Sequence, residues 1–170
     1  ISARLADLMG SHIEVSRGIG QGSEFSFTVA LGLADQALPS PAPDEFPGLR
    51  VLIVDDHPLA RTLLTQACAG FGWQASALEC AVAGLDELRK SRAEERDYDL
   101  LLLDWRMPDI DGIEMLRQAT AAADISLPLV VLMVSTYEME LAIAAADDLY
   151  LDSLLSKPIT PASLLDAVTR

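Results

Sequence analysis

Five polar side chains follow four apolar runs of the sequence, and their types suit chemistry on phosphate groups. They comprise three acids, one hydroxyl and one amine: Asp55 and Asp56 after residues 49–54, Asp104 after 100–103, Ser135 after 129–134, and Lys157, before Pro158, after 151–155. In an open parallel α/β sheet the carboxyl ends of the strands share one edge, where ligands bind. We therefore expect the five side chains to converge on a single cleft.

The three acids favour a bound cation and a nucleophilic role. Carboxylates brought within a few ångströms repel one another, which favours proton uptake or cation binding. Mg²⁺ prefers hard oxygen ligands and is typically held by a few carboxylates together with phosphate oxygens. A carboxylate can also attack phosphorus to form an acyl phosphate. Phosphoryl transfer then needs positive charge and a hydroxyl donor at the phosphoryl oxygens, which Lys157 and Ser135 supply.

From residue 49 onward, the hydrophobic pattern predicts alternating strands and helices. The expected strands are 49–54, 73–78, 99–103, 128–134 and 150–155, and the expected helices are 58–69, 80–92, 112–122, 137–147 and one beginning at Thr160. Several strands are continuous apolar runs, which is typical of strands whose two faces are both covered by helices. The fold class is therefore α/β, a doubly wound five-stranded parallel sheet with right-handed crossovers and helices on both faces.

The first 48 residues have a different pattern. Residues 1–33 predict a helix at Ser2–Met9 ended by Gly10, then a strand at His12–Ser16, a glycine-rich turn and a second strand at Glu24–Leu31. Residues 34–48 contain four prolines and predict a semi-extended linker.

Composition excludes several classes of protein. The formal net charge of −14 argues against nucleic-acid binding, which needs a basic face. The longest apolar run has eight residues, too few to span a bilayer, and no secretion signal is present. Cys68 and Cys80 lack metal-site spacing and are expected to be reduced thiols. We expect a cytoplasmic fragment of a longer protein, which could itself be membrane-anchored.

Residues 49–170 resemble the receiver domain of two-component response regulators. The matching residues are Asp55 and Asp56 after the first strand, Asp104 after the third, Met107-Pro108 and Asp111-Gly112 in the next loop, Ser135, and Lys157-Pro158. The resemblance implies the flavodoxin-like strand order 2-1-3-4-5, numbered within this segment. It also implies that the Lys157-Pro158 peptide is cis.

The resemblance further implies roles for the site residues. Asp104 would accept a phosphoryl group from a phosphohistidine, Ser135 would donate a hydrogen bond to a phosphoryl oxygen, and Lys157 would pair with it. Asp55, Asp56, Asp104 and the backbone carbonyl of Arg106 would hold Mg²⁺.

The sequence departs from the receiver pattern at a few positions, and alternatives stay open. Leu154 stands where an aromatic residue is common, three positions before the lysine. A small residue is common after the hydroxyl, but here Thr136 and then Tyr137 follow, and Arg106 is large and charged. One alternative is therefore a degenerate receiver that acts as a docking or inhibitory domain without phosphorylation. Another is an aspartate-nucleophile phosphatase. That class carries an Asp-x-Asp motif after the first strand, whereas here the two acids are adjacent and the third follows the third strand.

Residues 1–33 resemble the closing part of a histidine-kinase ATP-binding domain. The matching stretches are Arg4–Gly10 and Gly20–Phe27. This resemblance implies a hybrid sensor histidine kinase, of which the present fragment lacks the ATP site and the phosphorylatable histidine. The implied partners are a histidine-kinase dimerisation domain, a histidine phosphotransfer protein, or both.

Overall fold

The computed structural model describes residues 2–18, 22–32 and 48–169. The chain divides into two compact units, Ile1–Leu38 and Pro39–Arg170, and the boundary lies inside the proline-rich stretch expected as a linker. The middle of the expected glycine-rich turn, residues 19–21, and most of the expected linker lie outside the described residues. Within the described part of the chain, no helix has the length and apolar character needed to cross a membrane.

The first unit consists of a helix and a hairpin. Helix α1 spans Ser2–Leu8, and strands β1 (Glu14–Gly18) and β2 (Gly22–Ser26) pair in antiparallel register. Gly10 has φ of +71°, which suits the residue that ends a helix in the left-handed region. The second strand is shorter than expected, because it ends at Ser26 opposite Glu14, where its partner begins. A strand continues only as far as a neighbour can accept its hydrogen bonds.

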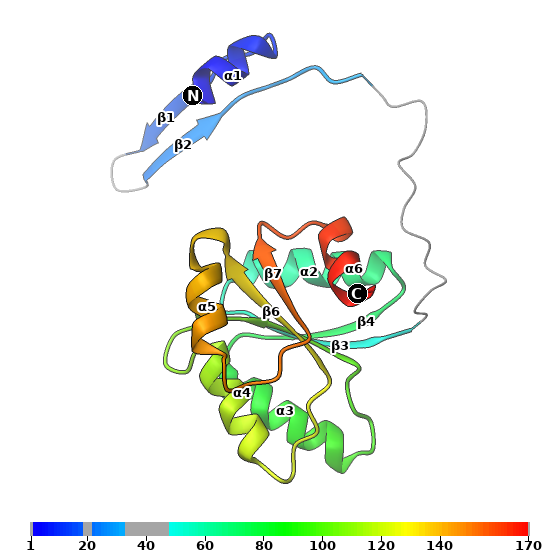
Figure 1. The fold of residues 1–170 in the computed structure, drawn as a ribbon. Coiled ribbons are helices and arrows are strands. Elements are labelled where there is room, and N and C mark those ends of the chain that lie inside the picture. The colour runs from blue at the N-terminus through cyan, green and yellow to red at the C-terminus, as the bar shows by residue number, and fades with distance from the viewer. Residues whose placement is uncertain (1, 19–21, 33–47, 170) are drawn as a thin grey trace. The chain divides into compact units, whose positions relative to one another are not determined.

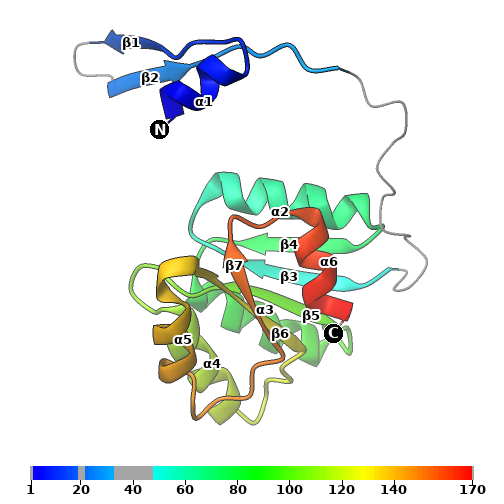
Figure 2. The same ribbon diagram turned by 45° about the horizontal axis from the view of Figure 1, so that its top comes forward.

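The second unit is built on a parallel five-stranded sheet in the order β4-β3-β5-β6-β7. Its strands are β3 (Arg50–Val54), β4 (Gln74–Leu78), β5 (Leu100–Asp104), β6 (Leu129–Ser135) and β7 (Ser153–Lys157). This order corresponds to 2-1-3-4-5 within the segment, so the expected doubly wound, flavodoxin-like sheet is confirmed. Figures 1 and 2 show helices packed on both faces of the sheet.

Alternation along the strands divides the core of this unit between two faces. Leu101 and Leu103 face helices α3 (Ala81–Ala93), α4 (Gly112–Ala121) and α5 (Met139–Ala145). Leu100 and Leu102 face α2 (Pro58–Gly70) and α6 (Pro161–Thr169). Every residue of β5 is buried, which explains why this strand is one unbroken apolar run before its terminal acid.

In the second unit, the expected bounds of the last strand and of the helix before it are wrong. β7 begins at Ser153 rather than at residue 150, because the Asp152 carboxylate accepts a hydrogen bond from the backbone N–H of Val130 at 2.7 Å. The helix expected over 137–147 is a 3₁₀ turn at Thr136–Glu138 followed by α5, which ends at Ala145. There the Arg117 guanidinium of α4 donates to the Ala145 carbonyl at 2.7 Å, which satisfies one of the final carbonyls of α5.

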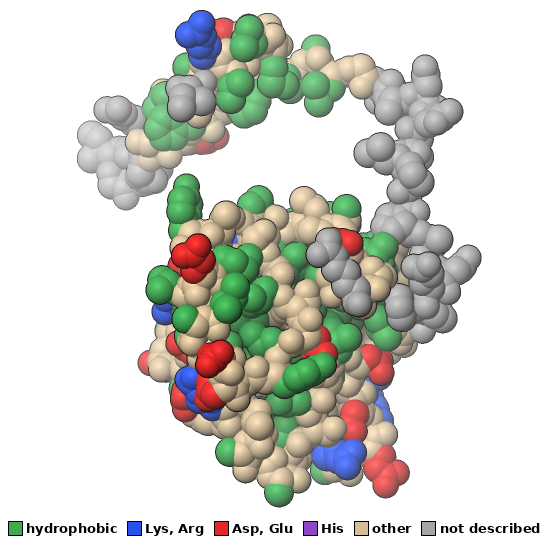
Figure 3. All heavy atoms as spheres, in the orientation of Figure 1, with side chains coloured by type: hydrophobic (Ala, Val, Ile, Leu, Met, Phe, Trp, Pro, Cys, Tyr) green, Lys and Arg blue, Asp and Glu red, His purple; other side chains and the backbone are tan. Residues whose placement is uncertain are grey.

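Acidic side chains outnumber basic ones in the second unit. Residues 49–170 contain 20 acidic and 10 basic side chains. On the face drawn in Figure 3, hydrophobic side chains interrupt an otherwise polar surface in several places. Leu141 and Ile143 on α5 are more than half exposed.

Candidate functional site

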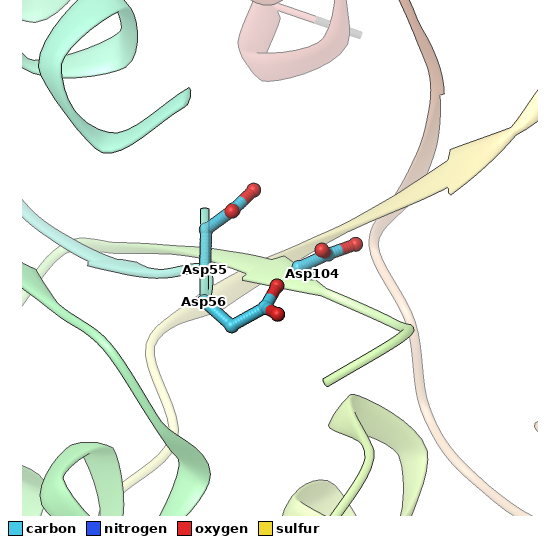
Figure 4. A group of neighbouring side chains, drawn as sticks. All are labelled: Asp55, Asp56 and Asp104. Carbon is cyan, nitrogen blue, oxygen red and sulfur yellow. The ribbon is translucent and has the colours of Figure 1, made fainter. Parts of the chain in front are cut away.

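The carboxyl edge of the sheet brings the three expected acids together. Asp55 and Asp56 follow β3, Asp104 ends β5, and one carboxylate oxygen from each lies within 4.8 Å of the others. Figure 4 shows the three side chains projecting into one region beyond the ends of these strands. Asp55 and Asp104 are buried, whereas Asp56 is exposed.

Lys157 joins the two buried acids. Its Nζ lies 3.2 Å from Asp55 Oδ2 and 2.9 Å from Asp104 Oδ2. It reaches them from the last residue of β7, where it lies opposite Ser135 of β6 in the parallel register. Its own burial lowers the pKa of Lys157, but its bonds and charge interactions with the two acids outweigh this and raise the pKa overall. Lys157 is therefore an ammonium at neutral pH.

Burial has the opposite consequence for Asp104. Desolvation raises the pKa of its carboxyl, and the bond and charge of Lys157 only partly offset this rise. The negative charge of Asp55 raises the same pKa further. A cation at this position would relieve both effects, because it replaces lost hydration and neutralises the neighbouring acid.

The backbone after β3 holds Asp55 in place. The backbone N–H of His57 donates to Asp55 Oδ1 at 2.8 Å, and the Arg61 guanidinium donates to the backbone carbonyl of Asp55 at 2.7 Å. His57 is the residue that precedes α2, and Pro58 begins that helix. His57 thus contributes to the site through its backbone, as a neighbour of the acids.

The three acids fit a magnesium ion by the nature of their donor atoms. All offer hard carboxylate oxygens, and their combined charge of −3 is only partly balanced by the single ammonium of Lys157. The backbone N–H of Arg106 interacts with the Asp104 carboxylate, which places the Arg106 peptide beside the acids. The role of the Arg106 carbonyl as a ligand stays a prediction.

The loop after β5 packs tightly against Asp104. Gly112 begins α4, and a Cβ added there would lie 2.3 Å from the backbone carbonyl oxygen of Asp104. Asp111 caps the helix by accepting from the backbone N–H of Glu114 at 2.9 Å. The Asp-Gly pair thus has a physical reason: the acid begins the helix, and the glycine allows the helix to approach the strand end.

Ser135 lies at the edge, but its hydroxyl is engaged. It donates to Glu138 Oε2 at 2.6 Å, and Glu138 Oε1 accepts from Arg106 Nε at 2.8 Å. The Arg106 guanidinium also stacks on the buried Trp105 ring, 3.8 Å from its centroid. Glu138 was not predicted from the sequence as a member of the site. Its position three residues after the hydroxyl was the one signal that could have indicated it.

The positions that depart from the receiver pattern have distinct surroundings. Thr136 is exposed and donates to the Lys157 carbonyl at 3.3 Å, and the Tyr137 side chain is 97% exposed. Leu154 packs partly buried against the core. Tyr137 is therefore directed into solvent rather than packed over the acids.

A largely apolar groove adjoins the acids. It has a volume of about 580 Å³ and lies between α2 and the segment that joins β7 to α6. Leu59 and Leu63 of α2 contribute to its lining, as do Asp55 and Lys157 of the site. The Lys157–Pro158 peptide at its border is cis, as expected from the resemblance.

Comparison with protein families and curated proteins gives a consistent result. The model of the response regulator receiver domain matches residues 51–169. Sensor histidine kinase AruS of Pseudomonas aeruginosa is 33% identical over 115 residues, which cover 68% of this chain and 11% of the relative. Sensor histidine kinase AtsR of Burkholderia thailandensis is 31% identical over 168 residues, covering 94% and 27%. The aerobic respiration control sensor protein ArcB of Escherichia coli is 30% identical over 170 residues, covering 96% and 21%.

The chain therefore spans about a quarter or less of the length of these relatives. Among solved structures, the receiver domain of a sensor histidine kinase from Pseudomonas aeruginosa, described with a magnesium ion coordinated in its active site cleft, has a TM-score of 0.62 at 20% identity. That likeness covers 72% of this chain and 96% of the other. A chemotaxis response regulator of Vibrio cholerae has the same TM-score at 19% identity, covering 72% and 98%. At such identities, the likeness establishes the fold alone.

Proposed function

The chain belongs to the response regulator receiver domain family, and from this premise we propose that Asp104 accepts a phosphoryl group from a phosphohistidine in a phosphorelay. The observation that carries the proposal is the contact of Lys157 with both buried acids, at 3.2 and 2.9 Å. A fold does not require a lysine facing three acids at a strand edge. Receiver chemistry does, because the lysine can pair with a phosphorylated carboxylate.

The proposed step transfers one phosphoryl group between two side chains. An oxygen of the Asp104 carboxylate attacks phosphorus, the P–N bond to the donor imidazole breaks, and an acyl phosphate forms. Lys157 pairs with the new negative charge, and the Ser135 hydroxyl donates to a phosphoryl oxygen. Asp55, Asp56, Asp104 and the Arg106 carbonyl would hold Mg²⁺, which supplies positive charge to the phosphoryl oxygens when it is bound.

We propose that the protein that carries the phosphohistidine binds in the groove beside the acids. A phosphohistidine presented on a helix could place its imidazole over Asp104 while the helix covers the apolar lining that includes Leu59 and Leu63. Both leucines are more than half exposed, so their burial would favour association. Either a kinase dimerisation domain or a histidine phosphotransfer protein has the required chemistry.

We also propose that residues 1–33 form the C-terminal end of a histidine-kinase ATP-binding domain in a hybrid sensor kinase. The relatives AtsR and ArcB align over nearly the whole chain, which includes this unit. In the described part of the first unit, Leu8 and Phe25 are 79% and 69% exposed. Apolar side chains so exposed on a helix and a hairpin suit elements that pack against the rest of a larger domain.

The test is labelling with a small phosphodonor, such as phosphoramidate, followed by intact-mass measurement. We expect one added phosphoryl group in the presence of Mg²⁺, and none without Mg²⁺ or in Asp104→Asn. Asp109→Asn is the matched control, because Asp109 is an exposed acid of the following loop and should still be labelled. Labelling of Asp104→Asn equal to that of the wild type would contradict the assignment.

The alternative of a degenerate docking receiver finds no support in the relatives or in the side chains present. It predicts that the chain stays unlabelled under conditions in which another receiver is labelled. The aspartate-nucleophile phosphatase is disfavoured because the family match covers most of the chain.

A further inference from the structure

Glu138 accepts the hydrogen bond of the Ser135 hydroxyl, the group that the proposed phosphoryl chemistry requires as a donor. Ser135 Oγ is 2.6 Å from Glu138 Oε2, in the range of strong hydrogen bonds from a hydroxyl to a carboxylate. The other oxygen, Oε1, lies 2.8 Å from Arg106 Nε. Both oxygens of one carboxylate thus bind groups that border the acids.

The hydroxyl has only one proton to donate. While Ser135 donates to Glu138, it cannot donate to a phosphoryl oxygen on Asp104, because each hydroxyl is a single donor. An acyl phosphate that recruits this hydroxyl must therefore break the bond to Glu138. Arg106 is held differently, because its guanidinium directs only the Nε–H to Glu138 and has four further N–H donors.

The side chain of Glu138 has no competing structural duty in the described residues around it. Glu138 ends the 3₁₀ turn and precedes α5, but its carboxylate makes no capping hydrogen bond to that helix. It is a carboxylate at neutral pH, because the hydrogen bond from Ser135 and then that from Arg106 lower its pKa. Its contacts are directed at the site rather than at the helix that follows.

We propose that Glu138 is a positioning residue that holds Ser135 and Arg106 in a resting arrangement and competes with the phosphoryl group for the Ser135 hydroxyl. The proposal rests on the proposed function, since it assigns the competing ligand to phosphorylated Asp104. The hydrogen bond between Ser135 and Glu138 then favours the unphosphorylated state, because phosphorylation must break it. Removing the carboxylate should make the phosphoryl-bound arrangement easier to reach.

The first test uses beryllofluoride, which mimics a phosphoryl group on a carboxylate, titrated in the presence of Mg²⁺. The net contribution of one hydrogen bond corresponds to about a three- to tenfold change in affinity, so Glu138→Ala should bind beryllofluoride more tightly than the wild type by about that factor. Glu138→Gln, which keeps an acceptor but loses the charge, should give a smaller gain. Glu140→Ala is the matched control, because it removes an exposed acid two residues away.

A double-mutant cycle separates competition for the hydroxyl from a general effect of charge. In a Ser135→Ala background, the gain in beryllofluoride affinity from Glu138→Ala should fall to that from Glu140→Ala, because no Ser135 hydroxyl remains to be released. A gain that persists unchanged in this background would overturn the proposal, as would equal gains from Glu138→Ala and Glu140→Ala.

The second test examines the resting hydrogen bond in metal-free protein. A hydroxyl proton bound to a carboxylate is shielded from exchange, so the Ser135 hydroxyl should give an observable NMR signal in the wild type and lose it in Glu138→Ala. A signal equally persistent in Glu138→Ala would overturn the proposal. Failure of the wild type to take up a phosphoryl group at Asp104 would instead refute the proposed function, so the two failures are distinguishable.

Discussion

Replacement of Lys157 by methionine should lower the free energy of unfolding, and Mg²⁺ should restore part of the loss. Lys157 pairs with Asp55, which has no exposed surface, and with Asp104, which is 6% exposed. Each contact near 3 Å has a Coulomb energy of about 5 kcal/mol at an effective dielectric constant of about 20. Desolvation of the ammonium offsets much of this attraction.

The net cost can be bounded from measured behaviour of buried pairs. Removing one partner of a buried ion pair costs about 3–5 kcal/mol, because the remaining charge is left uncompensated. The Lys157 side chain is 34% exposed, so solvent screening reduces the expected loss to about 2–3 kcal/mol. For a unit of this size, such a loss lowers the melting temperature by about 8–12 °C.

The assay is chemical denaturation of the wild type and of Lys157→Met, each with and without Mg²⁺. Without the competing ammonium, the acids should bind Mg²⁺ more tightly. Ligand at a hundredfold excess over its Kd contributes about 2.7 kcal/mol to the free energy of unfolding. Mg²⁺ in excess stabilises both proteins, so a Kd about fivefold tighter in the variant should narrow the difference between variant and wild type by about 1 kcal/mol.

Lys90→Met is the control, because Lys90 is an exposed lysine 4.0 Å from Glu87. It should change the free energy of unfolding by no more than about 0.5 kcal/mol, with or without Mg²⁺. Equal stability of Lys157→Met and Lys90→Met would refute the reasoning. A Mg²⁺ effect identical in Lys157→Met and the wild type would refute the part that concerns competition for the acids.

Further predictions concern the strand end, the thiols and the buried indole. Gly112→Ala should lower the free energy of unfolding by about 1–3 kcal/mol in chemical denaturation, because the new Cβ would meet the Asp104 carbonyl. Burial raises the pKa of the Cys68 thiol from 9.0 to about 11. The free energy of unfolding should therefore fall as pH rises from about 9 to 11, because the Cys68 thiol ionises over this range more readily in the unfolded chain than in the folded one. Alkylation of the native protein near pH 8 should modify the partly exposed Cys80 and spare Cys68, as mass mapping would reveal. Trp105 emission should change on Mg²⁺ titration, because Trp105 directly follows Asp104 and its indole stacks on the Arg106 guanidinium; a flat titration would contradict this.

Much of the fold was predictable because its signals are local. The run of four leucines at 100–103 predicts a strand buried on both faces, and the structure places all four in the central strand β5. The acid that ends it is found at the edge because parallel strands carry their carboxyl ends to one side. Asp55, Asp56 and Lys157 could be named for the same reason, since each stands near the end of its own strand.

Boundaries that depend on distant partners could not be predicted in this way. β7 begins late because the Asp152 side chain binds the backbone of Val130, 22 residues earlier in the chain. Helix α5 ends at Ala145, where Arg117 of another helix takes up a carbonyl. Hydrophobic periodicity contains no information about these contacts, because they join polar groups from separate elements.

The sequence alone therefore determined which residue types reach the edge of the sheet, and tertiary structure decided how they are paired. Lys157 contacts both buried acids because the register of β6 and β7 places it at the edge. Glu138 became part of the site only when the 3₁₀ turn directed its carboxylate to Ser135 and Arg106. An apolar segment is buried because its side chains are transferred out of water, and the composition of the segment itself predicts this. The pairing of polar side chains depends on ångström-scale geometry, which exists only after the whole sheet has assembled.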